Sequence, residues 1–156
     1  MRRITDPFLS AVECYNRLLN DYRRHESLVV AVDFDNTIYD FHNKGYIFDN
    51  VISLIKDCNE LGFKVVIFSS SPKSRHAFIR KHCEEIGIKI DGINEDVVDF
   101  TKGGEINAGG KIYYNIFLDD RAGLGQAYNT LNSLVQSIKV SKLQQQKYEK
   151  ESRNAD

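Results

Sequence analysis

Two pairs of aspartates follow two apolar segments of the chain, at the points where each segment ends. Asp33 and Asp35 come directly after the apolar run 28–32, and Asp119 and Asp120 come after a second apolar run further along. Carboxylates that crowd together repel one another, and a bound divalent cation is the usual way to keep them charged. Oxygen ligands suit Mg²⁺, which is held by a few carboxylates and waters and often by a substrate phosphate. If the fold brings the two segment ends together, the four aspartates predict a magnesium site.

The hydrophobic pattern predicts strands that alternate with helices. Short β-branched runs predict buried strands, and apolar side chains at steps of three and four predict amphipathic helices. The expected strands are 28–32, 63–68, 88–93 and 113–118, and the expected helices are about 7–24, 50–61, 71–87 and 124–138. Alternation of this kind implies parallel strands joined by right-handed crossovers. We therefore expect an α/β fold, a single three-layer open sandwich of the Rossmann type with a mainly parallel sheet.

A third polar cluster is expected at the same edge of this sheet. Residues 69–71 are three serines that follow the expected strand 63–68. In an open parallel sheet, ligands bind beyond the carboxyl ends of the strands, so the serines and the aspartates should face one another. A single Asp at a strand end is most often a turn former. Two strand ends that each close with a pair of acids indicate a joint site instead.

The two ends of the chain carry different patterns. The first helix, about 7–24, has one apolar stripe, which consists of Phe8, Val12, Tyr15, Leu19 and Tyr22. Such a stripe should be buried, either on the rest of the domain or on a second subunit of a homo-oligomer. The last segment, 141–156, is rich in Gln, Lys and Glu and has little to bury. We expect a frayed helix end or a disordered tail there, and a single catalytic domain over 1–140.

The composition excludes several classes of protein. The chain has 156 residues, of which 42% are hydrophobic and 28% charged, with a net charge of −1. These values fit one folded domain and exclude binding that rests on bulk positive charge. The longest clean apolar run is far shorter than the roughly 20 residues that cross a bilayer, and no signal peptide is visible. Three cysteines without CxxC spacing exclude a disulfide framework. We expect a reduced, cytoplasmic protein without membrane contact.

The order of the polar clusters resembles that of the haloacid dehalogenase-like (HAD) phosphohydrolases. The first motif of that family is a hydrophobic strand that ends in Asp-x-Asp-x-Thr, which matches residues 33–37. The second is a strand that ends in Ser or Thr, matched by Ser69. The third is a Lys, for which Lys111 is the best-placed candidate, and the fourth is a strand that ends in paired acids, matched by Asp119 and Asp120. The matches occur in the family's order and span about 60% of the chain.

The resemblance implies a division of labour among the aspartates. Asp33 would be the nucleophile that attacks phosphorus and forms an aspartyl-phosphate. Asp35 would protonate the leaving oxygen and then activate water. Mg²⁺ would be held by Asp33 and Asp35, by Asp120 as the direct ligand of the fourth motif, and by Asp119 as a second-shell or water-mediated ligand.

The resemblance also implies a phosphate-binding wall. Ser69 and Ser70 would hydrogen-bond the phosphoryl oxygens, and Lys111 would neutralise charge on the phosphoryl group and on Asp33. Lys102 is a competing candidate for this lysine.

The cap domain that many members of the family carry is not expected in this chain. Only 31 residues separate Thr37 from Ser69, and the stretch 72–110 holds one helix and a short strand. The site should therefore be open. An open site suits a bulky phosphorylated partner, or a small substrate that a neighbouring subunit covers.

Together these observations predict a Mg²⁺-dependent phosphomonoester hydrolase that acts through an aspartyl-phosphate. The helix after Ser69 is basic, with Lys73, Arg75, Arg80 and Lys81. These charges favour a phosphorylated small molecule such as a nucleotide, or a phosphorylated nucleic-acid end, although they also suit a solvated helix face. Two alternatives stay open: a phosphate-accepting signalling module, and a non-catalytic binding protein on the same fold. In a receiver module a single phosphoacceptor Asp closes a middle strand, whereas Ser69 closes it here.

Overall fold

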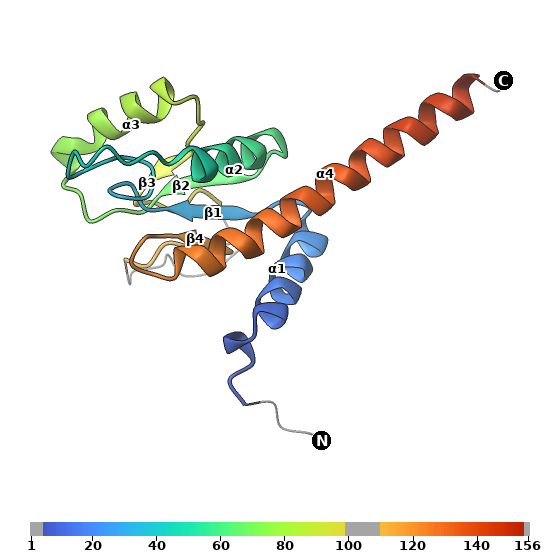
Figure 1. Ribbon diagram of the computed structural model, residues 1–156, viewed down its shortest axis with the longest axis horizontal. Coiled ribbons are helices and arrows are strands. Elements are labelled where there is room, and N and C mark those ends of the chain that lie inside the picture. The colour runs from blue at the N-terminus through green and yellow to red at the C-terminus, as the bar shows by residue number, and fades with distance from the viewer. Residues whose placement is uncertain (1–4, 99–109, 155–156) are drawn as a thin grey trace.

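The computed structural model describes residues 5–98 and 110–154, and Figure 1 shows how they are arranged. In this part of the chain four parallel strands form one sheet: β1 (Val29–Val32), β2 (Lys64–Ile67), β3 (Gly92–Ile93) and β4 (Ile116–Leu118). The α-helices are α1 (Ala11–His25), α2 (Asp49–Glu60), α3 (His76–Glu85) and α4 (Leu124–Asn154), and short 3₁₀ helices lie at Pro7–Leu9 and Lys73–Arg75. The predicted alternation of strands and helices is confirmed, although the strands are shorter than predicted.

The strand order places β1 in the interior of the sheet. The order is β3-β2-β1-β4, so β1 is hydrogen-bonded to β2 on one side and to β4 on the other. In chain order α2 lies between β1 and β2, and α3 lies between β2 and β3. Because every strand pair is parallel, the carboxyl ends of β1, β2 and β4 meet at one edge. The α/β class is confirmed, and the arrangement is compatible with a Rossmann-like sandwich.

The two faces of the sheet are buried in different ways. Along β1, Val30 and Val32 belong to a large core that includes side chains from all four of these α-helices. Val29 and Ala31 belong to a second, smaller core, which Ile112 completes and to which no described α-helix contributes. Alternate side chains of a strand point to opposite faces, and a strand covered on both faces reads as a continuous apolar run. The described residues thus supply the sheet and one helical layer of the predicted sandwich.

Helix α1 packs against the rest of the domain through a face that the sequence located only in part. Phe8 and Val12 of the predicted stripe do not pack on the rest of the domain, because their side chains are 57% and 65% exposed; their burial on a second subunit stays a prediction. Leu18, which lies outside the predicted stripe, is completely buried in the large core. Figure 1 shows the reason: α1 crosses α4, and the N-terminal end of α1 points away from the sheet. Ser10 caps the N-terminus of α1: its side chain accepts a hydrogen bond from the backbone N–H of Glu13 at 3.4 Å.

Helix α4 continues well beyond the core. Residues 141–154, for which the sequence predicts a frayed end or a disordered tail, continue α4 as regular helix up to Asn154. Its buried side chains end at Ile138, and the second half projects from the domain (Figure 1). Contacts between residues four apart support this half locally, among them an ion pair of Lys147 with Glu151 at 4.0 Å. Neither α4 nor any other helix in 5–98 and 110–154 is apolar enough to cross a membrane.

We expect Leu18→Ala to lower the free energy of unfolding by about 2–5 kcal/mol, because it leaves a cavity in the large core. Urea denaturation followed by circular dichroism measures this loss. Val12→Ala is the matched control on the same helix, and its effect should stay within about 0.5 kcal/mol because the side chain is exposed. Equal losses in the two variants would contradict the packing of α1 described above.

Candidate metal and phosphate site

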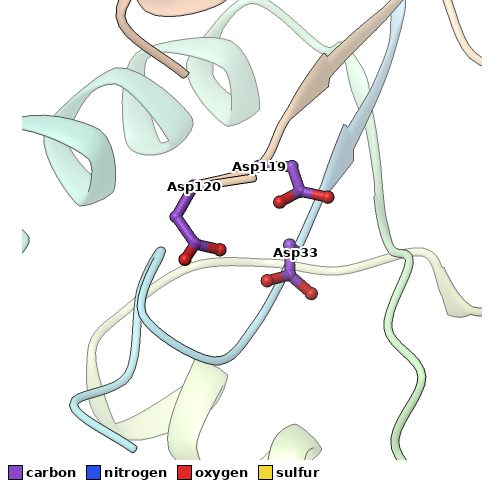
Figure 2. Close-up of side chains that lie close together, drawn as sticks. All are labelled: Asp33, Asp119 and Asp120. Carbon is purple, nitrogen blue, oxygen red and sulfur yellow. The ribbon is translucent and has the colours of Figure 1, made fainter. Parts of the chain in front are cut away.

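The pairing of β1 with β4 brings the two acidic motifs together. Val32 lies opposite Leu118 in the parallel register, and the N–H of Asp33 donates to the carbonyl oxygen of Leu118 at 2.8 Å. Carboxylate oxygens of Asp33, Asp119 and Asp120 all lie within 4.8 Å of one another (Figure 2). We call these three residues the carboxylate cluster. The predicted meeting of the two strand ends is confirmed.

The carboxylates of the cluster repel one another, and this repulsion changes the pKa of Asp33. The pKa of Asp33 is raised from 3.8 to about 6, first by burial of its carboxyl and then by repulsion from Asp119, Asp120 and Asp35. A hydrogen bond from the backbone of Phe34 opposes the shift in part. Three oxygen donors that repel one another at this distance fit a hard divalent cation such as Mg²⁺. The donor set therefore agrees with the predicted metal, and the residues that could hold it are the three of the cluster.

The turn after β1 is fixed to the fourth motif by a buried threonine. Thr37 is completely buried, and its Oγ1 accepts a hydrogen bond from the N–H of Asp120 at 3.2 Å. Asn36, which stands where many members of the resembled family have Gly, adopts a left-handed backbone with φ 60°, a conformation that Asn tolerates better than most residues. The Thr of the first motif thus positions Asp120 relative to the loop that carries Asp33 and Asp35.

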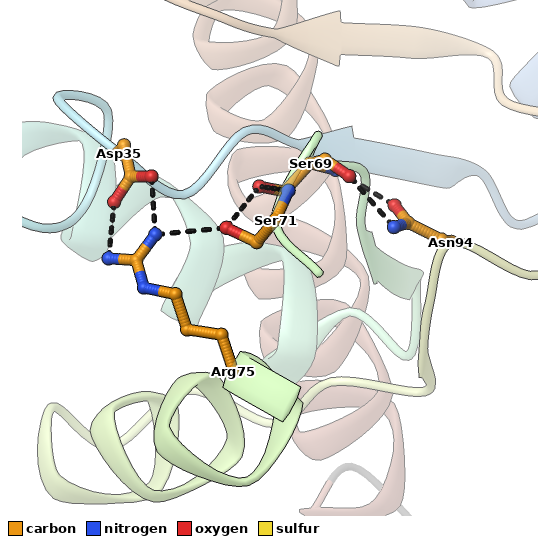
Figure 3. Close-up of polar contacts among 5 residues, drawn as sticks. All are labelled: Asp35, Ser69, Ser71, Arg75 and Asn94. Atoms are coloured by element: carbon orange, nitrogen blue, oxygen red, sulfur yellow. Dashed lines mark hydrogen bonds and ion pairs between the residues drawn. The ribbon is translucent and has the colours of Figure 1, made fainter. Parts of the chain in front are cut away.

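Asp35 lies outside the carboxylate cluster and is paired with an arginine. Arg75 donates two hydrogen bonds to its carboxylate, at 2.6 and 2.8 Å, and a third to Ser71 at 2.9 Å (Figure 3). The guanidinium also stands 5.2 Å from the ring centre of Phe41, and its hydrogen bond to Asp35 raises the pKa of Arg75. Such a two-pronged pair is among the strong charge-assisted contacts in proteins. The predicted role of Asp35 as a metal ligand through its side chain is therefore not supported by the geometry.

The sequence did not single out this pairing. Arg75 reads as one member of a basic helix, and its partner lies 40 residues away in the chain. A basic residue close after the strand end that carries Ser69 is the one signal that was present in the sequence.

The side chain of Asn94 holds the serine loop, residues 69–71, which follows β2. Asn94 accepts a hydrogen bond from the N–H of Ser69 at 2.8 Å and donates one to its carbonyl oxygen at 2.7 Å. The hydroxyl of Ser69 donates to that of Ser71 at 3.1 Å and accepts from its N–H at 3.2 Å. Figure 3 shows these contacts as one network that reaches from Asn94 to Asp35. The loop proposed to bind phosphate is thus held in one conformation.

The cluster and the serines line one open cavity of about 530 Å³. Its walls are made by four aspartates, by other polar residues and by three rings, which are Asp33, Asp35, Asp119, Asp120, Asn36, His42, Ser69, Ser70, Arg121, Phe41, Phe68 and Phe117. Arg121 brings a positively charged side chain to this lining. Its backbone N–H donates a hydrogen bond to the carboxylate of Asp119 at 2.7 Å.

The structure does not bring Lys111 to this cavity. Lys111 is exposed and precedes the amino end of β4, whereas the cluster lies at the carboxyl end of that strand. It is not among the described residues that line the cavity. The competing candidate, Lys102, lies outside the described residues.

Comparison with known proteins supports the fold. No family model matches the chain, and no curated protein matches it significantly. Among solved structures, a conserved protein from Bacteroides thetaiotaomicron is similar, with 20% sequence identity and a TM-score of 0.53. The match covers 69% of this chain and 91% of that one. At this identity the likeness concerns the α/β fold alone.

We expect Asp33→Asn to stabilise the metal-free protein by an amount that grows as pH rises. A carboxyl whose pKa is higher in the folded state than in the unfolded state costs stability as pH rises between the two values, here from 3.8 to about 6. Urea unfolding in EDTA should find the variant about 1–2 kcal/mol more stable at pH 7.5, after allowance for solvent screening. The difference should vanish near pH 4. A difference that does not change with pH would contradict the repulsion within the cluster.

We expect Asp120→Ala to weaken Mg²⁺ binding more than Asp119→Ala does. One carboxylate oxygen of Asp119 already accepts the hydrogen bond from Arg121, whereas the hydrogen bond of Asp120 uses its backbone N–H and leaves its carboxylate available. Calorimetric titration of each variant with Mg²⁺ measures the dissociation constants, and we expect losses of about tenfold or more for Asp120→Ala. A larger loss for Asp119→Ala would reverse the assignment of the direct ligand.

Proposed function

We propose that this protein is a Mg²⁺-dependent phosphomonoester hydrolase that acts through an aspartyl-phosphate on Asp33. The observation that carries the proposal is the carboxylate cluster, which lines an open cavity that Ser69 and Ser70 also line. Phosphoryl transfer depends mainly on positioning and on neutralisation of charge. Acids that need a cation, beside hydroxyl groups that can bind phosphoryl oxygens, supply both requirements.

Two displacements would complete the reaction. In the first, an oxygen of Asp33 forms a bond to phosphorus while the bond from phosphorus to the leaving oxygen breaks. Asp35, released from Arg75 and protonated, gives that oxygen a proton. In the second, water attacks phosphorus and gives a proton to Asp35. The bond between phosphorus and Asp33 then breaks, which restores the carboxylate and releases inorganic phosphate.

The surrounding side chains would hold the phosphoryl group during both steps. The hydroxyl of Ser70, and that of Ser69 once it turns from Ser71, would donate hydrogen bonds to its oxygens, and Arg121, which also lines the cavity, would offset its charge. Mg²⁺ bound to the carboxylate cluster would neutralise these acids and the developing charge on the phosphoryl oxygens. In the metal-free protein the pKa of Asp33 is about 6, and a cation bound to the cluster would further favour the ionised form that a nucleophile requires.

The proposed substrate is a phosphorylated small molecule, such as a nucleotide, or a phosphorylated nucleic-acid end. The cavity is open, and no cap domain lies between the described strands of the site. The basic helix supports a polyanionic substrate less than its sequence suggests. Arg75 is engaged with Asp35, and a ring nitrogen of His82 contacts the carbonyl oxygen of Ile38 at 3.2 Å.

A phosphate-accepting signalling module is the second candidate, and one contact favours it. Asp35 is held by Arg75 through both carboxylate oxygens. Both oxygens of this carboxylate already accept hydrogen bonds from the guanidinium, so Asp35 must leave Arg75 before it can take a proton from water. If the pair persists during the reaction, the aspartyl-phosphate would be long-lived and the protein would store the phosphoryl group.

We expect wild-type protein to release phosphate from phosphomonoesters only with Mg²⁺ present, and Asp33→Asn to lose at least about a thousandfold in rate because it lacks the nucleophile. The test panel contains an aryl phosphate, nucleoside monophosphates, sugar phosphates and oligonucleotides phosphorylated at either end. Malachite green detects released phosphate, and intact-protein mass spectrometry detects a phosphorylated Asp33.

The outcomes separate the candidates. Stable phosphorylation of wild-type Asp33 without release of phosphate favours the signalling module. Equal turnover by wild type and Asp33→Asn would remove Asp33 from the mechanism. Neither release nor phosphorylation across the panel would leave a binding protein as the remaining candidate.

A further inference from the structure

Three phenylalanine rings line the cavity beside the carboxylate cluster. Phe68 directly precedes Ser69, Phe117 lies on β4 two residues before Asp119, and Phe41 belongs to the loop that follows the first motif. The rings come from three separate segments and share one cavity with the acids. One part of this cavity is therefore suited to a phosphoryl group and another part to an apolar group.

Two of these rings, Phe68 and Phe117, pack against the smaller core. The ring centres of Phe68 and Phe117 are 5.6 Å apart, and Tyr114 stands 5.4 Å from Phe117. All three side chains pack against the buried cluster of Val29, Ala31, Val66 and Ile112. Rings that packing has already fixed lose little freedom when a ligand binds, so they favour binding more than mobile rings would.

The third ring stands on a loop with its own internal support. The carboxylate of Asp40 accepts hydrogen bonds from three consecutive backbone N–H groups, at Lys44, Gly45 and Tyr46, at 2.7–3.1 Å. Phe41 follows this aspartate directly and is 51% exposed. Its neighbour His42 also lines the cavity. The loop therefore presents an exposed aromatic side chain at the mouth of the site.

The size of the cavity leaves room for an organic group as well as for phosphate. Its volume of about 530 Å³ falls within the range of roughly 300–1,000 Å³ that is usual for small-molecule pockets. The acids and serines account for the phosphate end.

We propose that Phe41, Phe68 and Phe117 form a subsite for a flat aromatic group joined to the phosphate, such as an aryl ring or a nucleobase. This inference rests on the proposed function and narrows its substrate class. Aromatic rings attract one another through their quadrupoles beyond the effect of buried area. The subsite should therefore prefer an aromatic group over a saturated ring of similar size by about tenfold in affinity.

The test compares two ligands that differ only in aromaticity. Benzyl phosphate and cyclohexylmethyl phosphate are titrated calorimetrically, with Mg²⁺ present, into Asp33→Asn protein, which should bind the esters without turnover. We expect benzyl phosphate to bind about tenfold more tightly. On the same background, Phe68→Leu and the half-exposed Phe41→Leu should each reduce this preference to less than about threefold.

The control variant is titrated with the same two esters. Phe78→Leu changes a ring that is 42% exposed and does not line the cavity, so it should keep the full preference. Equal affinities for the two esters, or a preference that survives both Phe68→Leu and Phe41→Leu, would overturn the aromatic subsite. Failure of the proposed function looks different: benzyl phosphate binds more tightly, yet wild-type protein neither hydrolyses it nor becomes phosphorylated by it.

Discussion

The parallel pairing of β1 with β4 is the contact on which the candidate site depends. It pairs Val32 with Leu118 in register, and Asp33 and Asp119 directly follow these two residues. The acids that follow both strands therefore have carboxylate oxygens within 4.8 Å of one another. Their mutual repulsion adds to the effect of burial and raises the pKa of Asp33 to about 6. The two cores that cover β1 stabilise this arrangement, because all four residues of the strand are buried. The hydrophobic packing thus offsets an electrostatic cost that a bound cation would remove.

Asp35, the fourth aspartate that lines the cavity, is paired with an arginine, unlike the three aspartates of the carboxylate cluster. Asp35 receives both of its strong contacts from Arg75, which also reaches the serine loop through Ser71. It therefore adds little to the negative charge that a cation must balance. Arg75 links the loop after β1 to the loop after β2, and Asn94 links the latter to the end of β3. The loops that follow β1 and β2 are consequently fixed to one another and to the end of β3.

Much of this arrangement could be predicted from local sequence. The β-branched runs gave the strands, and parallel topology then determined that Asp33 and Asp119 would meet. The pairing of Asp35 with Arg75 could not be predicted, because a basic residue in a helical segment is equally typical of a solvated helix face. Lys111 was misplaced for a topological reason: a residue before a parallel strand lies at the edge opposite its carboxyl end. The helical segment 141–154 buries nothing, so burial-based reasoning had no signal for it.

The most direct test of the account is a crystal structure of the protein grown with Mn²⁺ in place of Mg²⁺, with data collected for anomalous scattering from the metal. The account predicts an anomalous peak between the carboxylates of Asp33 and Asp120, with Asp119 beside it and Asp35 still paired with Arg75. An empty carboxylate cluster at saturating Mn²⁺, or a metal bound elsewhere on the domain, would contradict the claim that this edge of the sheet is built to hold a cation.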